Sequence, residues 1–224
     1  MQLLMTGLGA LIMVAICGLS LFFIIADAQR GYTTTNPKPI AVRDITSQLV
    51  DAEPLSLEEV FPDPEIKLVP GAAAYLIGMT HIDTDCDIAT NGALGTLFKA
   101  HGCTQVVRAS MTAPYGGYHV TAGVFNFAYQ RDATLIGDLA GRHVEAGDGS
   151  FAAMSTGLPG VDPAIQPMSQ VGWHNSGHFL VYCVIARPDG QVVRDDDPYA
   201  QRIAADLVES YLGGTVIGKR TLSP

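Results

Sequence analysis

The chain has 224 residues, of which 48% are hydrophobic and 16% charged, and its formal net charge is −9. A chain of this length and composition can form one sizeable folded domain with appendages. Because it is acidic and has only four lysines, a surface that binds nucleic acid or anionic lipid is not expected. The charge is better explained as keeping the domain soluble.

The first 26 residues contain no charged side chain. As a helix they would extend roughly 39 Å, which exceeds the roughly 30 Å hydrocarbon core of a bilayer. We therefore predict a transmembrane helix over residues 1–26, with the lipid bilayer as its partner. A cleaved secretory signal is the alternative, since Ala26-Asp27-Ala28 fits the small-residue cleavage pattern. Against it, a basic start is missing and the apolar run exceeds the usual length of about 7 to 15 residues.

The charges that flank this segment give a mixed indication of topology. Arg30, Lys38 and Arg43 follow it, and the positive-inside rule would keep such a flank in the cytoplasm. Long domains, however, are translocated largely regardless of charge, and the cysteine content suits an oxidising compartment. We expect a single-pass protein of the cell membrane whose C-terminal domain is extracytoplasmic.

Residues 27–64 contain five prolines and seven acidic residues. Since proline stiffens the chain and removes backbone donors, this composition predicts a semi-extended tether. One helical turn is expected at Ser56–Phe61, where Ser56 and Glu59 make a capping box. Phe61 is expected to dock the tether on the folded domain.

The globular domain is predicted over residues 65–218, followed by a tail at 219–224. Its first strand is expected at Ala73–Met79. A helix is predicted over Asp87–His101, because apolar residues recur there on one face of a 3.6-residue period. Gly102 should end this helix, as glycine commonly does.

Two alternating segments, Gln105–Thr112 and Tyr118–Phe125, are joined by the Gly- and Pro-containing turn Pro114–Gly117. This pattern predicts a β-hairpin. A second helix is expected at Asp132–Arg142. The glycines and prolines of Ala146–Gln170 then mark a long loop, which is either functional or mobile.

The apolar run His178–Ala186 is the strongest strand signal, and it can pair with Val171–His174 as a hairpin. A last helix is predicted at Pro198–Leu212, ending at Gly213-Gly214. The order β-α-β-β-α-β-α predicts an α+β fold with a ferredoxin-like (split βαβ) antiparallel sheet, helices on one face and an added C-terminal helix. That fold hosts many functions, so it does not decide the activity.

Several longer segments also carry a resemblance: LSLEEVFPD, the Asp85-Cys86 pair at the head of a helix, GCTQVVRAS, YHVTAGVFNF and GHFLVYCVIARPDG, behind one membrane segment. In these the chain resembles a group of uncharacterised actinobacterial single-pass membrane-anchored proteins with a small extracytoplasmic α+β domain. The resemblance covers most of residues 55–215. It implies the location and the fold, but the group has no known activity, so it implies no catalytic residue.

Cys86 and Cys103 flank the predicted central helix, and a disulfide between them would suit an oxidising compartment. An unbroken helix would hold its ends roughly 22 Å apart, whereas a disulfide needs Cα atoms within about 7 Å. Either the helix starts late and residues 86–90 fold back, or the cysteines pair differently. Cys183, in the most apolar strand, is expected to be a buried thiol.

Residues 81–87 alternate a histidine and three acids with other residues, in the manner of a cation site. A calcium loop counted from Asp83 would need glycine at its sixth position and glutamate at its twelfth. Ile88 and Leu94 stand at those positions. Helix capping explains the acids, and neither a metal nor another cofactor is expected.

His174 and His178 have the four-residue spacing of zinc ligands on a helix. The Asn-Ser-Gly sequence between them predicts a turn instead, and no glutamate completes an HExxH motif. The nucleophile elbow, the P-loop and the dinucleotide-binding glycine motif are also missing from the sequence. Trp173, His174, Asn175 and His178 are therefore candidates for a ligand-binding site, or form only a hairpin tip.

These observations predict a non-catalytic, membrane-anchored binding or accessory domain that recognises an envelope protein or a small ligand. The contacts would come from the long loop 146–170 and the turn 173–178. The alternative is a metal-dependent or hydrolytic enzyme that uses His119, His174, His178 and nearby acids. An enzyme needs these side chains to converge in one concave site, so their placement separates the two hypotheses. A purely structural role in an envelope assembly also stays open.

Overall fold

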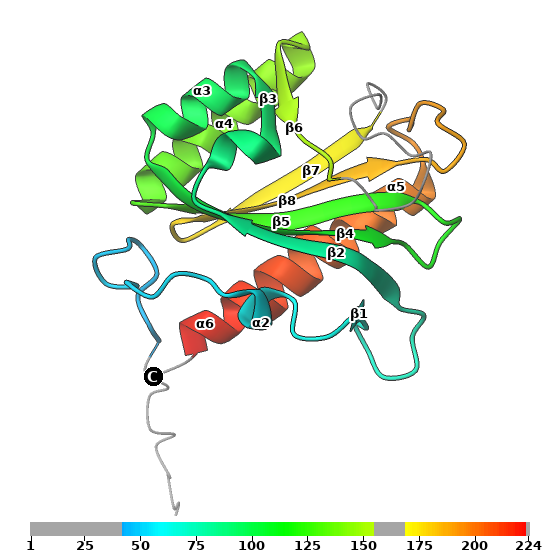
Figure 1. The fold of residues 1–224 in the computed structure, drawn as a ribbon, viewed down its shortest axis with the longest axis horizontal. Coiled ribbons are helices and arrows are strands. Elements are labelled where there is room, and N and C mark those ends of the chain that lie inside the picture. Colours follow the sequence, from blue (N-terminus) through cyan, green and yellow to red (C-terminus); the bar gives the residue numbers. More distant parts are fainter. Residues whose placement is uncertain (1–41, 155–168, 223–224) are drawn as a thin grey trace, which may run out of the picture. The chain divides into compact units, whose positions relative to one another are not determined.

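The computed structural model describes residues 42–154 and 169–222, which contain a six-stranded sheet with helices on both of its faces (Figure 1). The strand order is β1-β2-β4-β5-β8-β7, and every neighbouring pair is antiparallel. The α+β class is therefore confirmed, whereas the prediction of helices on one face is wrong. The predicted membrane helix 1–26 lies outside the described residues, and no helix within them is long and apolar enough to cross a membrane.

The sheet is built mainly from hairpins between neighbours in the sequence. In spatial order its strands are β1 (Glu65–Ile66), β2 (Tyr75–Asp83), β4 (Cys103–Thr112), β5 (His119–Phe127), β8 (Phe179–Ala186) and β7 (Gln170–Ser176). Both predicted hairpins, β4–β5 and β7–β8, are confirmed. All eight residues of β8 are buried, because each face of this strand packs against a separate hydrophobic cluster.

The ferredoxin-like topology is wrong. A split βαβ arrangement includes parallel neighbours, but β2 pairs antiparallel with β4, and β5 pairs antiparallel with β8. The connection from β2 to β4 turns back through a short 3₁₀ helix and a two-stranded ribbon, which leaves its α-helix only eight residues long. It returns the chain beside β2 instead of carrying it over the sheet as a parallel crossover would.

That connection comprises η1 (Cys86–Ala89), β3 (Thr90–Gly92) and α3 (Ala93–Ala100). The helix predicted from Asp87 thus begins late, at Ala93. Cys86 and Cys103 form a disulfide with their Cα atoms 6.3 Å apart, as the fold-back alternative requires. Gly102, at φ +71°, follows the end of the helix as predicted.

One face of the sheet is covered by a continuous C-terminal helical run. It consists of α5 (Pro198–Ala204), the π-helical segment η3 (Ala205–Ile217) and α6 (Gly218–Leu222). The predicted end at Gly213-Gly214 is wrong, because buried Leu212, Val216 and Ile217 flank the glycines and their packing outweighs the poor helix propensity of glycine. Residues 219–222, expected as a tail, belong to the fold.

The N-terminal segment from residue 42 to residue 64 packs on the same face (Figure 1). Its α2 (Leu57–Val60) is capped as predicted, since the Ser56 hydroxyl accepts a hydrogen bond from the Glu59 backbone N–H. Leu55, Val60 and Phe61 are 2%, 0% and 7% exposed. This part of the predicted tether is therefore integral to the domain.

The opposite face carries α3, α4 (Gln130–Ala146) and the ribbon of β3 with β6 (Gly149–Phe151). The predicted second helix is confirmed and extends at both ends. Phe98 of α3 lies at the centre of an aromatic cluster, with ring centroids 4.6 Å from Phe125, 5.4 Å from Phe127 and 6.1 Å from Phe151. Residues 155–168 of the predicted long loop lie outside the described residues.

Candidate functional site

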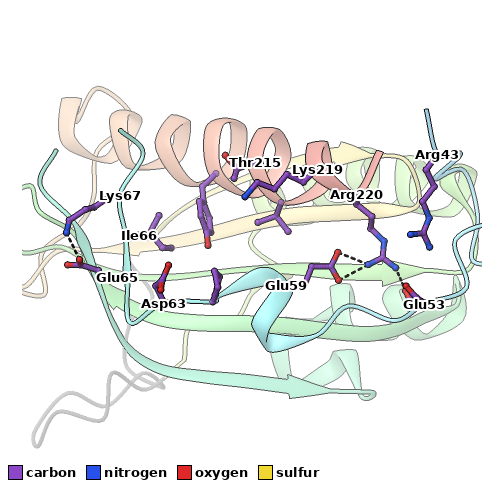
Figure 2. A pocket seen from close by; sticks show the side chains of 13 residues that line it. Arg43, Glu53, Glu59, Asp63, Glu65, Ile66, Lys67, Thr215, Lys219 and Arg220 are labelled. Atoms are coloured by element: carbon purple, nitrogen blue, oxygen red, sulfur yellow. Dashed lines mark hydrogen bonds and ion pairs between the residues drawn. The ribbon is translucent and has the colours of Figure 1, made fainter. Parts of the chain in front are cut away.

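A groove of about 580 Å³ lies between the N-terminal segment and the C-terminal helical run (Figure 2). Its lining mixes both signs of charge with a few apolar side chains. The lining residues are the basic Arg43, Lys67, Lys219 and Arg220, the acidic Glu53, Glu59, Asp63 and Glu65, and Pro62, Ile66, Tyr211, Thr215 and Val216.

At one end of the groove, Arg220 is held by a fixed set of acceptors. Its side chain is buried, and its Nε donates to Asp51 Oδ2 at 2.7 Å. Its Nη1 donates to both carboxylate oxygens of Glu59, at 2.7 and 2.8 Å, and its Nη2 donates to the carbonyl of Glu53 (Figure 2). All three branches of the guanidinium are engaged, so this wall of the groove is rigid.

Asp51 is fully buried and is the acceptor at the centre of this network. Besides Arg220, it contacts Arg43 Nη2 at 2.6 Å and His178 Nε2 at 3.2 Å. Burial alone would raise the pKa of Asp51, but the hydrogen bonds from Arg220 and His178 outweigh it and hold the pKa below its ordinary value. The carboxylate is therefore ionised at neutral pH.

The pKa of Arg220 shifts in the complementary direction. Burial would lower it, but hydrogen bonds to Asp51 and Glu59 outweigh burial and raise it. His178 completes the network, since its Nδ1 lies 2.8 Å from the carbonyl of Phe127. The network thus ties the N-terminal segment to the β7–β8 turn and to the C-terminal helix.

The other end of the groove is more open to solvent. Lys67 and Glu65 form an ion pair there, with side chains 47% and 40% exposed. The Tyr211 hydroxyl donates to the carbonyl of Val60 at 2.8 Å, and burial raises the pKa of Tyr211 to about 12. The exposed charges at this end are available to a partner in a way that the network around Asp51 is not.

The lining supplies charge but no pair of a serine or cysteine with a histidine. Among the described residues that line the groove, none is a cysteine, serine or histidine. Its two hydroxyls, on Thr215 and Tyr211, each donate to a backbone carbonyl. A serine or cysteine nucleophile with a histidine base is therefore missing from this lining, which instead offers charged and hydrogen-bonding groups.

The candidate ligand residues Trp173, His174, Asn175 and His178 do not all converge on one site, and only Trp173 and Asn175 share a contact. The Trp173 indole donates to the carbonyl of Gly137 in α4 at 3.0 Å, and Asn175 also packs on Gly137. His174 is exposed, and alternation along β7 directs it to the other face of the sheet. Only His178 reaches the network that adjoins the groove.

The three histidines of the enzyme hypothesis do not converge either. His119 opens β5, while His178 contacts Phe127 at the end of the same strand, which puts them roughly 26 Å apart along it. In the described part of the chain, no group of three or more His, Cys, Asp or Glu is placed to hold a metal ion. Cys183 is a buried thiol as predicted, and burial raises its pKa to about 12.

Sequence reasoning missed the charged network because its members are distant in the chain. Asp51 and Arg220 are 169 residues apart, and they lie in stretches expected to be a tether and a tail. Glu59 gave the only signal, as part of the predicted capping box. Its carboxylate bonds to Arg220.

No protein-family model matches the chain, and no curated protein or solved structure is detectably similar to it. The chemistry of the groove is therefore the main guide to function.

Proposed function

We propose that this chain is a membrane-anchored, extracytoplasmic binding domain that holds a charged peptide segment of an envelope protein in the groove. The observation that carries the proposal is the lining, in which four bases and four acids face a space of about 580 Å³ that no cysteine, serine or histidine of the described residues lines. The charge-free segment 1–26 supports membrane anchoring. The Cys86–Cys103 disulfide supports an oxidising compartment.

The balance of charges favours a peptide over a small apolar ligand. Pockets for small molecules are lined mostly by hydrophobic side chains, whereas eight of the thirteen residues here are charged. An extended peptide with side chains of both signs can pair with the Lys67–Glu65 end and with the exposed Glu53 at the opposite end at once. Such complementarity provides specificity and accelerates association more than it adds raw affinity.

The network around Asp51 favours binding in a second way. Because Arg220 and Glu59 are already fixed by mutual hydrogen bonds, the partner need not immobilise them. Pre-organisation of this kind lowers the entropic cost of association. The enzyme alternative on His119, His174 and His178 has no converged site to support it within the described residues.

The proposal is tested by peptide selection with the full-length chain in nonionic detergent micelles. Random peptides displayed on phage are enriched on the immobilised protein, and their affinities are measured by fluorescence anisotropy. We expect enriched peptides to carry both acidic and basic residues. Lys67→Glu should weaken their binding about fivefold or more, because one rim charge now repels.

Lys99→Glu is the matched control, since it makes the same charge change at an exposed position of α3, on the opposite face of the sheet. It should leave the affinities unchanged. Selection of no peptide above background, or equal weakening by both variants, would contradict the proposal.

A further inference from the structure

A buried arginine on the opposite face of the sheet has no counter-ion. Arg108 lies in the middle of β4 and is 8% exposed. Its Nε and one Nη are buried without a hydrogen-bond partner, and no carboxylate of the described residues forms an ion pair with it. An arginine side chain stays protonated in proteins, so this is a buried positive charge.

The strand register directs Arg108 toward Tyr182. Arg108 of β4, Gly123 of β5 and Tyr182 of β8 are opposite one another on three adjacent strands. A Cβ at Gly123 would lie 2.7 Å from the Arg108 Cβ, so the glycine leaves the space that the arginine side chain crosses. Burial raises the pKa of Tyr182, and the positive charge of Arg108 opposes that shift.

Other polar side chains are neighbours of Arg108 in the sheet. Ser110 lies two residues along β4 on the same face, and both Ser110 and Tyr182 are 0% exposed. The Ser110 Oγ has no hydrogen-bond partner among the described residues, and the Tyr182 hydroxyl has only the nearby Arg108 guanidinium. His81 is the neighbour of Arg108 on β2, and its buried Nδ1 is likewise unpaired in this part of the chain.

Such a concentration of unpaired groups calls for a ligand. Buried polar atoms in proteins are nearly always hydrogen-bonded, and an uncompensated buried charge strongly destabilises a fold. The guanidinium can only donate, and the two hydroxyls can donate as well. The hydroxyl oxygens can also accept, but none of these groups carries the negative charge that would compensate Arg108.

We propose that Arg108, Ser110 and Tyr182 bind the oxyanion group of a small ligand, a carboxylate or a phosphate. The planar guanidinium matches either group with two parallel hydrogen bonds. The hydroxyls of Ser110 and Tyr182 supply neutral donors to its remaining oxygens. This site lies on the other face of the sheet from the groove, and it goes beyond the proposed peptide binding.

The test is thermal unfolding of the full-length chain in nonionic detergent, followed by the fluorescence of Trp173. Sodium phosphate, sodium succinate and sodium chloride are compared at matched ionic strength, up to tens of millimolar. Phosphate or succinate should raise the Tm of the wild type saturably, by roughly 5–10 °C at 100 times its Kd, whereas chloride should not. The stronger of the two identifies the preferred oxyanion.

Variants locate the effect. Arg108→Met should abolish the rise and increase the Tm in chloride alone, because it replaces a buried unpaired charge with an apolar side chain of similar length. Arg194→Gln, at a guanidinium that is 78% exposed, removes the same charge and should respond as the wild type does. Tyr182→Phe should weaken oxyanion affinity about three- to tenfold without lowering stability.

If Arg108→Met does not fold, Tyr182→Phe and Ser110→Ala decide the question through their measured affinities. A wild type that responds to neither oxyanion overturns the proposal. If Arg108→Met folds and responds as the wild type does, the proposal is also overturned. If Arg108→Met does not fold, unaltered oxyanion affinity in both Tyr182→Phe and Ser110→Ala overturns it. Lys67→Glu should leave the response unchanged, so the groove and this site can fail independently.

Discussion

Asp51→Ala removes the shared acceptor of the buried charge network. In the native fold the Asp51 carboxylate lies 2.7 Å from Arg220 Nε, 2.6 Å from Arg43 and 3.2 Å from His178 Nε2. The variant leaves these three donors facing an apolar methyl group. Arg220 keeps its hydrogen bonds to Glu59, so part of its charge remains compensated.

Removing one partner of a buried ion pair costs about 3–5 kcal/mol. Because Glu59 still holds Arg220, we expect the lower end of that range, about 3 kcal/mol. A domain of this size loses about 2–4 °C of Tm per kcal/mol, so the Tm should fall by about 6–12 °C.

The assay is urea unfolding of the full-length chain at pH 7, followed by the fluorescence of Trp173, the only tryptophan of the sequence. This side chain reports on the folded domain, because its ring packs on Phe151 and its indole donates to Gly137. Asp196→Ala is the control, since it breaks an ion pair with Arg194 in which both side chains are exposed and screened by solvent. Its change should be barely measurable.

A loss below about 1 kcal/mol in Asp51→Ala, comparable to that of an exposed pair, would refute the view that this network holds the N-terminal segment on the domain.

Three further predictions test the fold. Because the pKa of Asp51 is lower in the folded than in the unfolded protein, its carboxylate stabilises the fold at pH values above its unfolded pKa near 4. This stabilisation is lost as the pH falls through the folded pKa. The stability of Asp51→Ala should therefore decline less between pH 5 and pH 3 than that of the wild type. The double substitution Cys86→Ser with Cys103→Ser should cost about 3 kcal/mol for a closed loop of this length, and reduction of the wild type should reproduce the loss in urea titrations. Gly177→Ala places an alanine at a left-handed φ of +58° and brings its Cβ to 2.3 Å from the carbonyl oxygen of Ile45. The N-terminal segment should therefore detach and be cleaved faster in limited proteolysis. Protection equal to that of the wild type would contradict the docking of this segment.

The sequence revealed the elements that depend on local patterns. The β4–β5 hairpin follows from alternation around a Gly-rich turn, and positive φ at Gly116 and Gly117 fits that turn. The disulfide requires a late helix start, which the sequence offered only as one of two alternatives, because the apolar period by itself predicted a helix from Asp87. The predicted strand order was wrong because tertiary contacts, and not local patterns, select which strands pair.

The sequence of β8 carries a signal for burial on both of its faces. The run from Phe179 to Ala186 is apolar without alternation, which is typical of a strand covered on both faces. It therefore indicated two helical layers, where one was predicted. The π-helical passage through Gly213-Gly214 had no comparable signal, since glycine there ordinarily marks an end.

The candidate site was harder to predict than the fold. Arg43, Asp51 and Arg220 occur in proline-rich or terminal stretches, where charged residues are usually solvated. Their burial results from contacts across most of the chain length. Arg108 was equally hidden, because a single arginine within an alternating strand is normally exposed, and only the sheet order places it in the interior.

Photo-crosslinking in intact cells tests the central claim, peptide binding in the groove, most directly. A photoreactive amino acid replaces Thr215, which lines the groove, and in a control it replaces Val192, which is 52% exposed outside it. We predict a discrete adduct from position 215 alone, mapped by mass spectrometry to one charged extracytoplasmic segment and lost when Lys67→Glu is added. An adduct shared by both positions, or none from position 215, would contradict the account.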